Sequence, residues 1–195
     1  PSPPTGLPRF ALAGMLVSRD SVWLYHKTSR REVYEEALAA HPGAFDVLLC
    51  NEEDAEMVFG IKAEGVDVRS GRLEADRYRD VADQIVRRFG CKYVSITLRE
   101  SLSATFNNWS GVLYDGRELY RSRSYSRYLV DRVGGGDGYA AGFFYGLLSG
   151  ASEQEAVNLG WAHGALLTTY PGDTTMATLD QVQAFARGGS ARIQR

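Results

Sequence analysis

The sequence is poor in the residues that mark specialised protein classes. Its two cysteines, Cys50 and Cys91, are too few for a disulfide framework, and its three histidines show no metal-ligand spacing. Basic and acidic side chains nearly balance at 22 and 24, so neither a nucleic acid nor a membrane surface is expected as a partner. The longest apolar stretch, 139–148, is about half of the roughly 20 residues that span a bilayer.

The two cysteines indicate the compartment of the protein. Both lie in apolar runs, which favours buried free thiols in a reducing environment over one disulfide bridge between them. We therefore expect a cytoplasmic protein.

Strand-like and helix-like segments alternate along the chain. The apolar runs 45–50 and 91–97 are continuous, as in strands that are buried on both faces of a parallel sheet. This alternation predicts a layered α/β domain with a mostly parallel sheet. The helices expected from periodicity and capping residues are 29–41, 52–59, 74–89, 138–148, 152–168 and one that begins near Thr178.

The middle of the chain has the pattern of a hairpin. Residues 103–120 are rich in aromatic and β-branched side chains, and Asp115-Gly116 lies among them. An Asp-Gly pair between two such runs is a strong hairpin signal. We expect two antiparallel strands joined at this turn.

A run of glycines is the most informative motif. Gly134, Gly135 and Gly136 directly precede an expected helix, so free backbone N–H groups and the positive end of the helix dipole meet at one point. Such a point favours an anion, above all a phosphate. Asp137 in the same turn suits a proton acceptor or a metal contact, because a carboxylate would repel the anion. The alternative is an ordinary helix that follows a flexible turn and is capped by an aspartate.

The stretch 131–142 resembles the signature of the ribokinase-like (PfkB) carbohydrate kinases, in which Asp-Thr-x-Gly-Ala-Gly-Asp opens a helix. The resemblance implies a ribokinase-like α/β/α fold, with Gly134, Gly135 and Gly136 as the anion hole and Asp137 as the catalytic base. The chain departs from the signature at Arg132 and at Gly135, where alanine is usual. Neither change removes a backbone N–H.

Other motifs agree with the nucleotide side of this resemblance. Asn51 and Asp54 follow a strand and resemble the Asn-x-x-Glu motif, which implies that they help to place Mg²⁺ and ATP through water; the alternative is a plain helix start. Thr97-Leu98-Arg99 resembles a Thr-Leu-Gly turn that contacts ATP. Trp161 is expected near the adenine, where it would stack on the base or block it.

Several motifs narrow the resemblance to the kinases of this family that act on 2-dehydro-3-deoxygluconate. The resemblance implies that Asp173, in Tyr170-Pro-Gly-Asp173, binds the sugar acid together with Asp137. A turn aspartate is the alternative. The other stretches that carry this resemblance are 96–101, 107–111 and 190–195.

The resemblance begins near Val33, and it predicts that residues 29–195 are the nucleotide-binding C-terminal part of such a kinase. Residues 1–28 match nothing and are expected to be a linker or a truncated start. The N-terminal part and the lid that build the sugar site have no counterpart in the chain. A sheet cut in this way exposes an edge strand, so we expect a homo-oligomer or association through that edge.

The leading hypothesis is an ATP- and Mg²⁺-dependent kinase that phosphorylates 2-dehydro-3-deoxygluconate. Its partners would be the sugar acid and ATP. The alternatives are another sugar or nucleoside kinase of the same fold, and a non-catalytic nucleotide-binding fragment.

Overall fold

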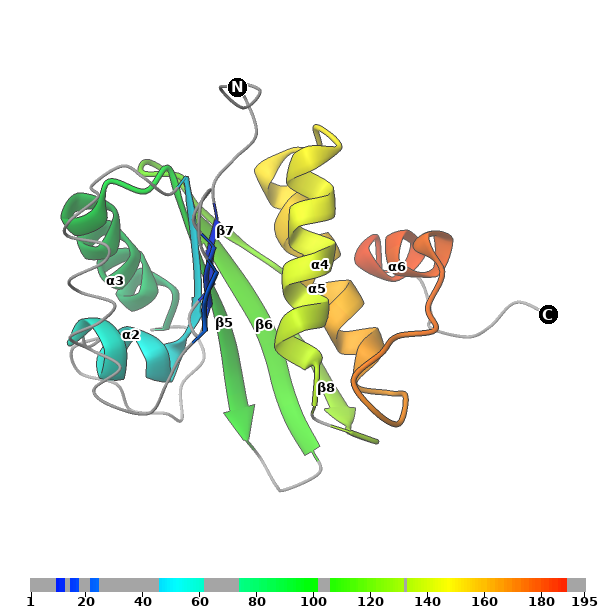
Figure 1. The fold of residues 1–195 in the computed structure, drawn as a ribbon. Coiled ribbons are helices and arrows are strands. Elements are labelled where there is room, and N and C mark those ends of the chain that lie inside the picture. Colours follow the sequence, from blue (N-terminus) through cyan, green and yellow to red (C-terminus); the bar gives the residue numbers. More distant parts are fainter. Residues whose placement is uncertain are drawn as a thin grey trace. The chain divides into compact units, whose positions relative to one another are not determined.

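Figure 1 shows the fold in a computed structural model, which describes residues 10–12, 15–17, 22–24, 46–61, 74–101, 106–131 and 133–188. The chain divides into two compact units. Unit 1 comprises Pro1–Ile96 and Tyr114–Leu119, and unit 2 comprises Thr97–Leu113 and Tyr120–Arg195. The glycine run and Asp137 belong to unit 2, whereas Asn51 and Asp54 belong to unit 1.

Strands β1 to β4 and the first residues of β5, up to Ile96, belong to unit 1 and are hydrogen-bonded in the order β3-β2-β1-β4-β5. β1 pairs with β4 in parallel, while β2 pairs with both β1 and β3 in antiparallel fashion, so the sheet is mixed where we expected a mostly parallel one. Three of these strands lie within residues 1–28, which the sequence left as a linker or a truncated start. The bounds are Phe10–Leu12 (β1), Met15–Val17 (β2), Val22–Leu24 (β3), Val47–Asn51 (β4) and Tyr93–Ser101 (β5).

Strand β4 and the helix after it follow the sequence pattern closely. Val47 and Leu48 are fully or almost fully buried, as expected for an apolar run with no polar alternation. Helix α2 (Glu52–Phe59) starts directly after the strand. It ends at Gly60, whose φ of 66° is the left-handed conformation that glycine adopts without strain.

Helix α3 (Glu74–Phe89) packs through one apolar face. Val81, Ile85 and Phe89 recur at helical spacing and are buried. The rings of Phe59 and Phe89 meet at 5.2 Å between centroids, which joins the ends of α2 and α3. Both helices lie on the same side of β4 (Figure 1).

The two cysteines are free and buried in unit 1, as predicted. Burial, with a smaller contribution from the charge of Asp46, raises the pKa of the Cys91 thiol to about 11. The thiol is therefore protonated at neutral pH and has little nucleophilic character.

The predicted hairpin is present and is closed by an aspartate. Strand β6 (Phe106–Tyr114) leads into β7 (Leu119–Arg121) through residues 115–118. One oxygen of Asp115, Oδ1, accepts hydrogen bonds from the N–H groups of Arg117 at 2.8 Å and Glu118 at 2.6 Å. Gly116 supplies the positive φ of 88° that the turn requires.

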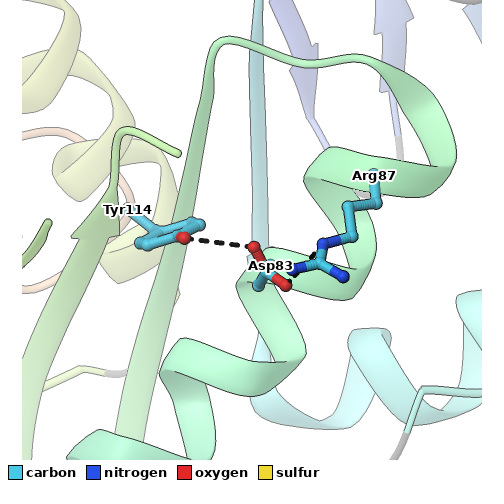
Figure 2. A network of polar contacts seen from close by, with 3 residues as sticks. All are labelled: Asp83, Arg87 and Tyr114. Atoms are coloured by element: carbon cyan, nitrogen blue, oxygen red, sulfur yellow. Dashed lines mark hydrogen bonds and ion pairs between the residues drawn. The ribbon is translucent and has the colours of Figure 1, made fainter. Parts of the chain in front are cut away.

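The hairpin turn is fastened to α3 by a small polar network (Figure 2). The Tyr114 hydroxyl donates to Asp83 Oδ1 at 3.1 Å, and Arg87 Nε pairs with Asp83 Oδ2 at 2.8 Å. Burial, followed by the hydrogen bond and the charge of Asp83, raises the pKa of Tyr114 above its usual value. Arg79 lies over the Tyr114 ring and donates to the carbonyl of Arg117.

Unit 2 contains further strands and three helices. β6 lies between β5 and β7 in the strand order and also pairs with β8 (Tyr125–Tyr128), antiparallel to it. The helices are α4 (Gly135–Leu148), α5 (Glu153–Leu167) and α6 (Leu179–Ala186). Capping boxes begin α5 at Ser152 and α6 at Thr178, as the sequence predicted for α5.

Helices α4 and α5 lie side by side and approach closely because glycines face the partner helix (Figure 1). A methyl group on Gly142 would come within 2.5 Å of the Leu159 carbonyl oxygen, and one on Gly146 within 2.8 Å of Ala156 Cα. Tyr139 and Phe143 between them are fully buried. The close contact holds α4 against α5, and the glycine run lies at the start of α4.

Two expectations fall outside the described residues, namely the helix at 29–41 and the closing motif at 190–195. In the part of the chain that the structure describes, no helix has the length and apolar character needed to cross a membrane.

Candidate functional site

The glycine run forms the start of α4. Gly134 is the N-cap with a φ of 79°, and it offers no side chain to cap the helix. The helix begins at Gly135, three residues earlier than the sequence predicted. The N–H groups of the first turn have no acceptor within their own helix, and the positive end of the helix dipole lies at the same point. This arrangement suits an anion.

The three glycines differ in how much space surrounds them. A Cβ on Gly134 would lie 2.8 Å from the Asp173 carbonyl oxygen, and one on Gly135 would lie 3.2 Å from Thr168 Cγ2. A Cβ on Gly136 would meet no heavy atom within 4 Å. Gly134 is therefore fixed by backbone conformation and by contact, whereas Gly136 lies at the open side of the turn.

Two of the predicted site residues lie near Gly134. Asp137 lies in the first turn of α4 and is exposed. The backbone of Asp173 lies against Gly134, and its side chain is also exposed. Residues 36 positions apart in the sequence are thus carried to one place by the antiparallel return of α5 along α4.

Asp131 is a residue that the sequence analysis did not assign to the site. Its Oδ1 accepts from the N–H of Val133 and its Oδ2 accepts from the N–H of Gly172, both at 3.0 Å. The carboxylate therefore joins the segment before α4 to the turn that carries Asp173. The signal available in the sequence was that Asp131 is the first residue of the stretch that resembles the Asp-Thr-x-Gly-Ala-Gly-Asp signature, just before a turn where aspartate often accepts local N–H bonds.

Asn51 and Asp54, in unit 1, form a capping box at the start of α2. Asn51 Oδ1 accepts from the Asp54 N–H at 2.7 Å, and Asp54 Oδ2 accepts from the Asn51 N–H at 3.2 Å. This is the helix start that the sequence left open as the alternative. Within the described residues, no group of three His, Cys, Asp or Glu side chains could hold a metal ion. A role of Asn51 and Asp54 toward Mg²⁺ through water stays a prediction.

Thr97, Leu98 and Arg99 lie inside β5, which continues to Ser101. The sequence placed a nucleotide-contacting turn here, and the structure instead shows extended strand. Leu98 is buried and Arg99 is exposed. Their contact with ATP stays a prediction.

Trp161 occupies the core of unit 2 and not an open pocket. Its side chain is 2% exposed, its Nε1–H donates to the Trp109 carbonyl at 2.9 Å, and its ring stacks on Phe185 with centroids 4.9 Å apart. An indole buried to this degree has no face open to adenine. We therefore remove Trp161 from the expected ATP contacts. Its neighbour His163 is also engaged, because Nδ1 lies 2.7 Å from the carbonyl oxygen of Gly138.

Comparisons with known proteins find relatives among the carbohydrate kinases. A family model described as pfkB family carbohydrate kinase matches residues 13–180. The chain is 51% identical over 106 residues to the 2-dehydro-3-deoxygluconokinase of Bacillus subtilis, which covers 54% of this chain and 30% of the relative. It is also 34% identical over 80 residues to the 2-dehydro-3-deoxygalactonokinase of Haloferax volcanii. The matched segment covers 41% of this chain and 25% of that relative.

Similarity to a solved structure extends over more of the chain. The 2-dehydro-3-deoxygluconokinase of Thermotoga maritima superposes with a TM-score of 0.73 at 34% identity, covering 82% of this chain and 46% of that one. This confirms the ribokinase-like α/β fold that the sequence predicted. The chain spans less than half of the length of each of these relatives.

Proposed function

Because this chain belongs to the pfkB family of carbohydrate kinases, we propose that it serves ATP-dependent phosphorylation of 2-dehydro-3-deoxygluconate at the start of α4. The observation that carries the proposal is the exposed carboxylate of Asp137 in the first turn of a helix whose N-cap has no side chain. The substrate is inferred from the names of the relatives in Bacillus subtilis and Thermotoga maritima.

The proposed chemistry divides into positioning and proton transfer. The N–H groups at the glycine run would donate to the oxygens of the transferring phosphoryl group, whose charge is spread over those oxygens in the transition state. A hydroxyl oxygen of the sugar acid forms the new bond to the γ-phosphorus while the bond to the β–γ bridging oxygen breaks. ADP leaves with that oxygen, and Asp137 takes the hydroxyl proton.

Asp173 and the proposed metal residues have supporting roles. The backbone of Asp173 lies against Gly134, and its exposed side chain would accept a hydrogen bond from a hydroxyl of the sugar acid. Mg²⁺ bound to the ATP phosphates would neutralise their charge. A contact of Asn51 and Asp54, at the start of α2 in unit 1, with Mg²⁺ through water is proposed from the motif resemblance alone.

The test compares Asp137→Asn with a matched control. Asp180 is also an exposed aspartate in the first turn of a helix, so Asp180→Asn removes the same charge from a similar position in α6. We expect Asp137→Asn to lower turnover with 2-dehydro-3-deoxygluconate by about 100-fold or more while ATP–Mg²⁺ binding persists. Asp180→Asn should leave both unchanged. Equal turnover in wild type and Asp137→Asn would remove Asp137 from this role.

A substrate panel separates the remaining possibilities. ADP release would be measured with 2-dehydro-3-deoxygluconate, its galactose-derived isomer and a nucleoside. Turnover with another of these substrates assigns a different kinase activity to the same site. Binding of ATP–Mg²⁺ without turnover of any substrate favours a nucleotide-binding role.

A further inference from the structure

The segment before α4 and the turn after α5 are joined by several hydrogen bonds. The carbonyl of Thr168 accepts from the N–H groups of Val130 at 3.0 Å and Asp131 at 3.3 Å. The carboxylate of Asp131 then spans the two segments, because it accepts from Val133 on its own side and from Gly172 on the other. Asp131 is the side chain that completes this connection.

A carboxylate is needed at this position because both partners are donors. Each oxygen of Asp131 receives one backbone N–H, and an ionised acceptor makes such bonds stronger than a neutral one. An asparagine would keep one acceptor oxygen. Its amide nitrogen would face the second N–H as a donor against a donor.

The hydrogen bond from the Gly172 N–H to Asp131 also restrains the next residue, Asp173. The backbone of Asp173 lies against Gly134. A Cβ built on Gly134 would be 2.8 Å from the carbonyl oxygen of Asp173. Residues 171–174 are exposed, so few packing contacts fix this turn. The hydroxyl of Thr174 donates to Asp173 Oδ1 at 3.3 Å, which is a contact within the turn and does not anchor it elsewhere.

We propose that Asp131 is a positioning residue that holds Asp173 beside the glycine run, and so sets the affinity of the site for the sugar acid. The placement follows from the two hydrogen bonds of Asp131 and the contact at Gly134. The effect on the sugar acid rests on the function proposed above. Asp131 would act through Asp173, since its own two oxygens accept backbone N–H groups.

The first measurement does not depend on activity. Amide hydrogen exchange of residues 169–178 would be followed in wild type, Asp131→Asn and the control Asp180→Asn. We expect the Gly172 amide to exchange about 10-fold faster or more in Asp131→Asn, while the amides of α5 keep their protection. Unchanged exchange at Gly172 would overturn the placement. Global unfolding of Asp131→Asn would also overturn it, since the carboxylate would then serve the fold as a whole.

The second measurement separates positioning from a general structural role. We expect Asp131→Asn to raise KM for 2-dehydro-3-deoxygluconate about 10-fold and KM for ATP less than about 3-fold, because Asp173 and not the nucleotide loses its place. In an Asp173→Ala background, Asp131→Asn should change the sugar-acid KM by less than about 2-fold. An equal effect in both backgrounds would contradict the proposal.

The two measurements also distinguish failure of this proposal from failure of the proposed function. If wild type shows no turnover of 2-dehydro-3-deoxygluconate while the Gly172 amide responds to Asp131→Asn, the substrate assignment fails and the positioning of Asp173 stands. If wild type turns over the sugar acid and the Gly172 amide does not respond, the positioning role of Asp131 fails alone.

Discussion

The carbonyl of Asp173 lies so close to Gly134 that a methyl group built on this glycine would approach it to 2.8 Å. This contact places the backbone of Asp173, in the turn after α5, beside the N-cap of α4. The N-cap of α4 is a glycine for two independent reasons. Its φ of 79° is a left-handed conformation that favours glycine, and a side chain at this position would meet the backbone of Asp173.

We predict that Gly134→Ala destabilises the chain by about 2 kcal/mol or more, because a left-handed backbone conformation and a clash with backbone atoms act together. Leu167 Cδ2, at 3.1 Å from the built Cβ, can rotate away, but the backbone of Asp173 must shift. Urea unfolding followed by circular dichroism measures the loss. A variant as stable as wild type would mean that the turn is not held as the structure shows.

Gly136→Ala is the matched control within the same run. The added methyl group meets no heavy atom within 4 Å, and residue 136 is already helical. Alanine allows the unfolded chain fewer backbone conformations than glycine does. We therefore expect the free energy of unfolding to stay equal or rise by about 0.5–1 kcal/mol. Loss of stability in this variant comparable to that of Gly134→Ala would show that the space around the two residues does not differ.

The sequence predicted best those features that depend on short local signals. Glu52–Phe59 and Glu74–Phe89 are helices with the expected bounds, because apolar spacing and a terminal glycine define them locally. The capping box at Ser152 and the turn at Asp115-Gly116 are confirmed for the same reason. The glycine run was correctly placed at a helix start.

Features that depend on tertiary contacts were not predicted. Burial of Trp161 against Phe185 depends on how α5 meets α6, and no local pattern reports it. The continuation of β5 through Arg99 depends on neighbouring strands. The role of Asp131 required knowledge that Gly172, 41 residues later, returns to within hydrogen-bond distance. Sequence spacing alone cannot supply such pairings.

The buried position of Trp161 predicts that its replacement affects stability and not nucleotide binding. Trp161→Phe removes the hydrogen bond to the Trp109 carbonyl and part of the stacking area on Phe185, for a cost of about 1–3 kcal/mol. We expect the affinity for ATP–Mg²⁺, measured by calorimetry well below the melting temperature, to change by less than about 2-fold. A marked loss of affinity with unchanged stability would restore Trp161 as an ATP contact.

The network at Tyr114 predicts how stability depends on alkaline pH. The folded state raises the pKa of Tyr114 above its ordinary value of 10.0, chiefly through burial and then through Asp83. The neutral phenol is therefore favoured by folding. Its contribution is fully present below pH 10 and is lost as the pH rises through the folded-state pKa, because the unfolded chain releases the proton first.

We predict that Tyr114→Phe lowers stability by about 1–2 kcal/mol at pH 7, where the hydrogen bond to Asp83 is lost, and that this difference from wild type narrows above pH 10. Urea unfolding at intervals from pH 7 to alkaline pH measures the difference directly. Tyr145→Phe is the control, since this α4 side chain is 43% exposed, and its difference from wild type should stay small throughout. A Tyr114→Phe difference that stays constant across pH 10 would contradict the stabilisation of the neutral phenol in the folded state, since ionisation of the hydroxyl must remove its hydrogen bond to Asp83.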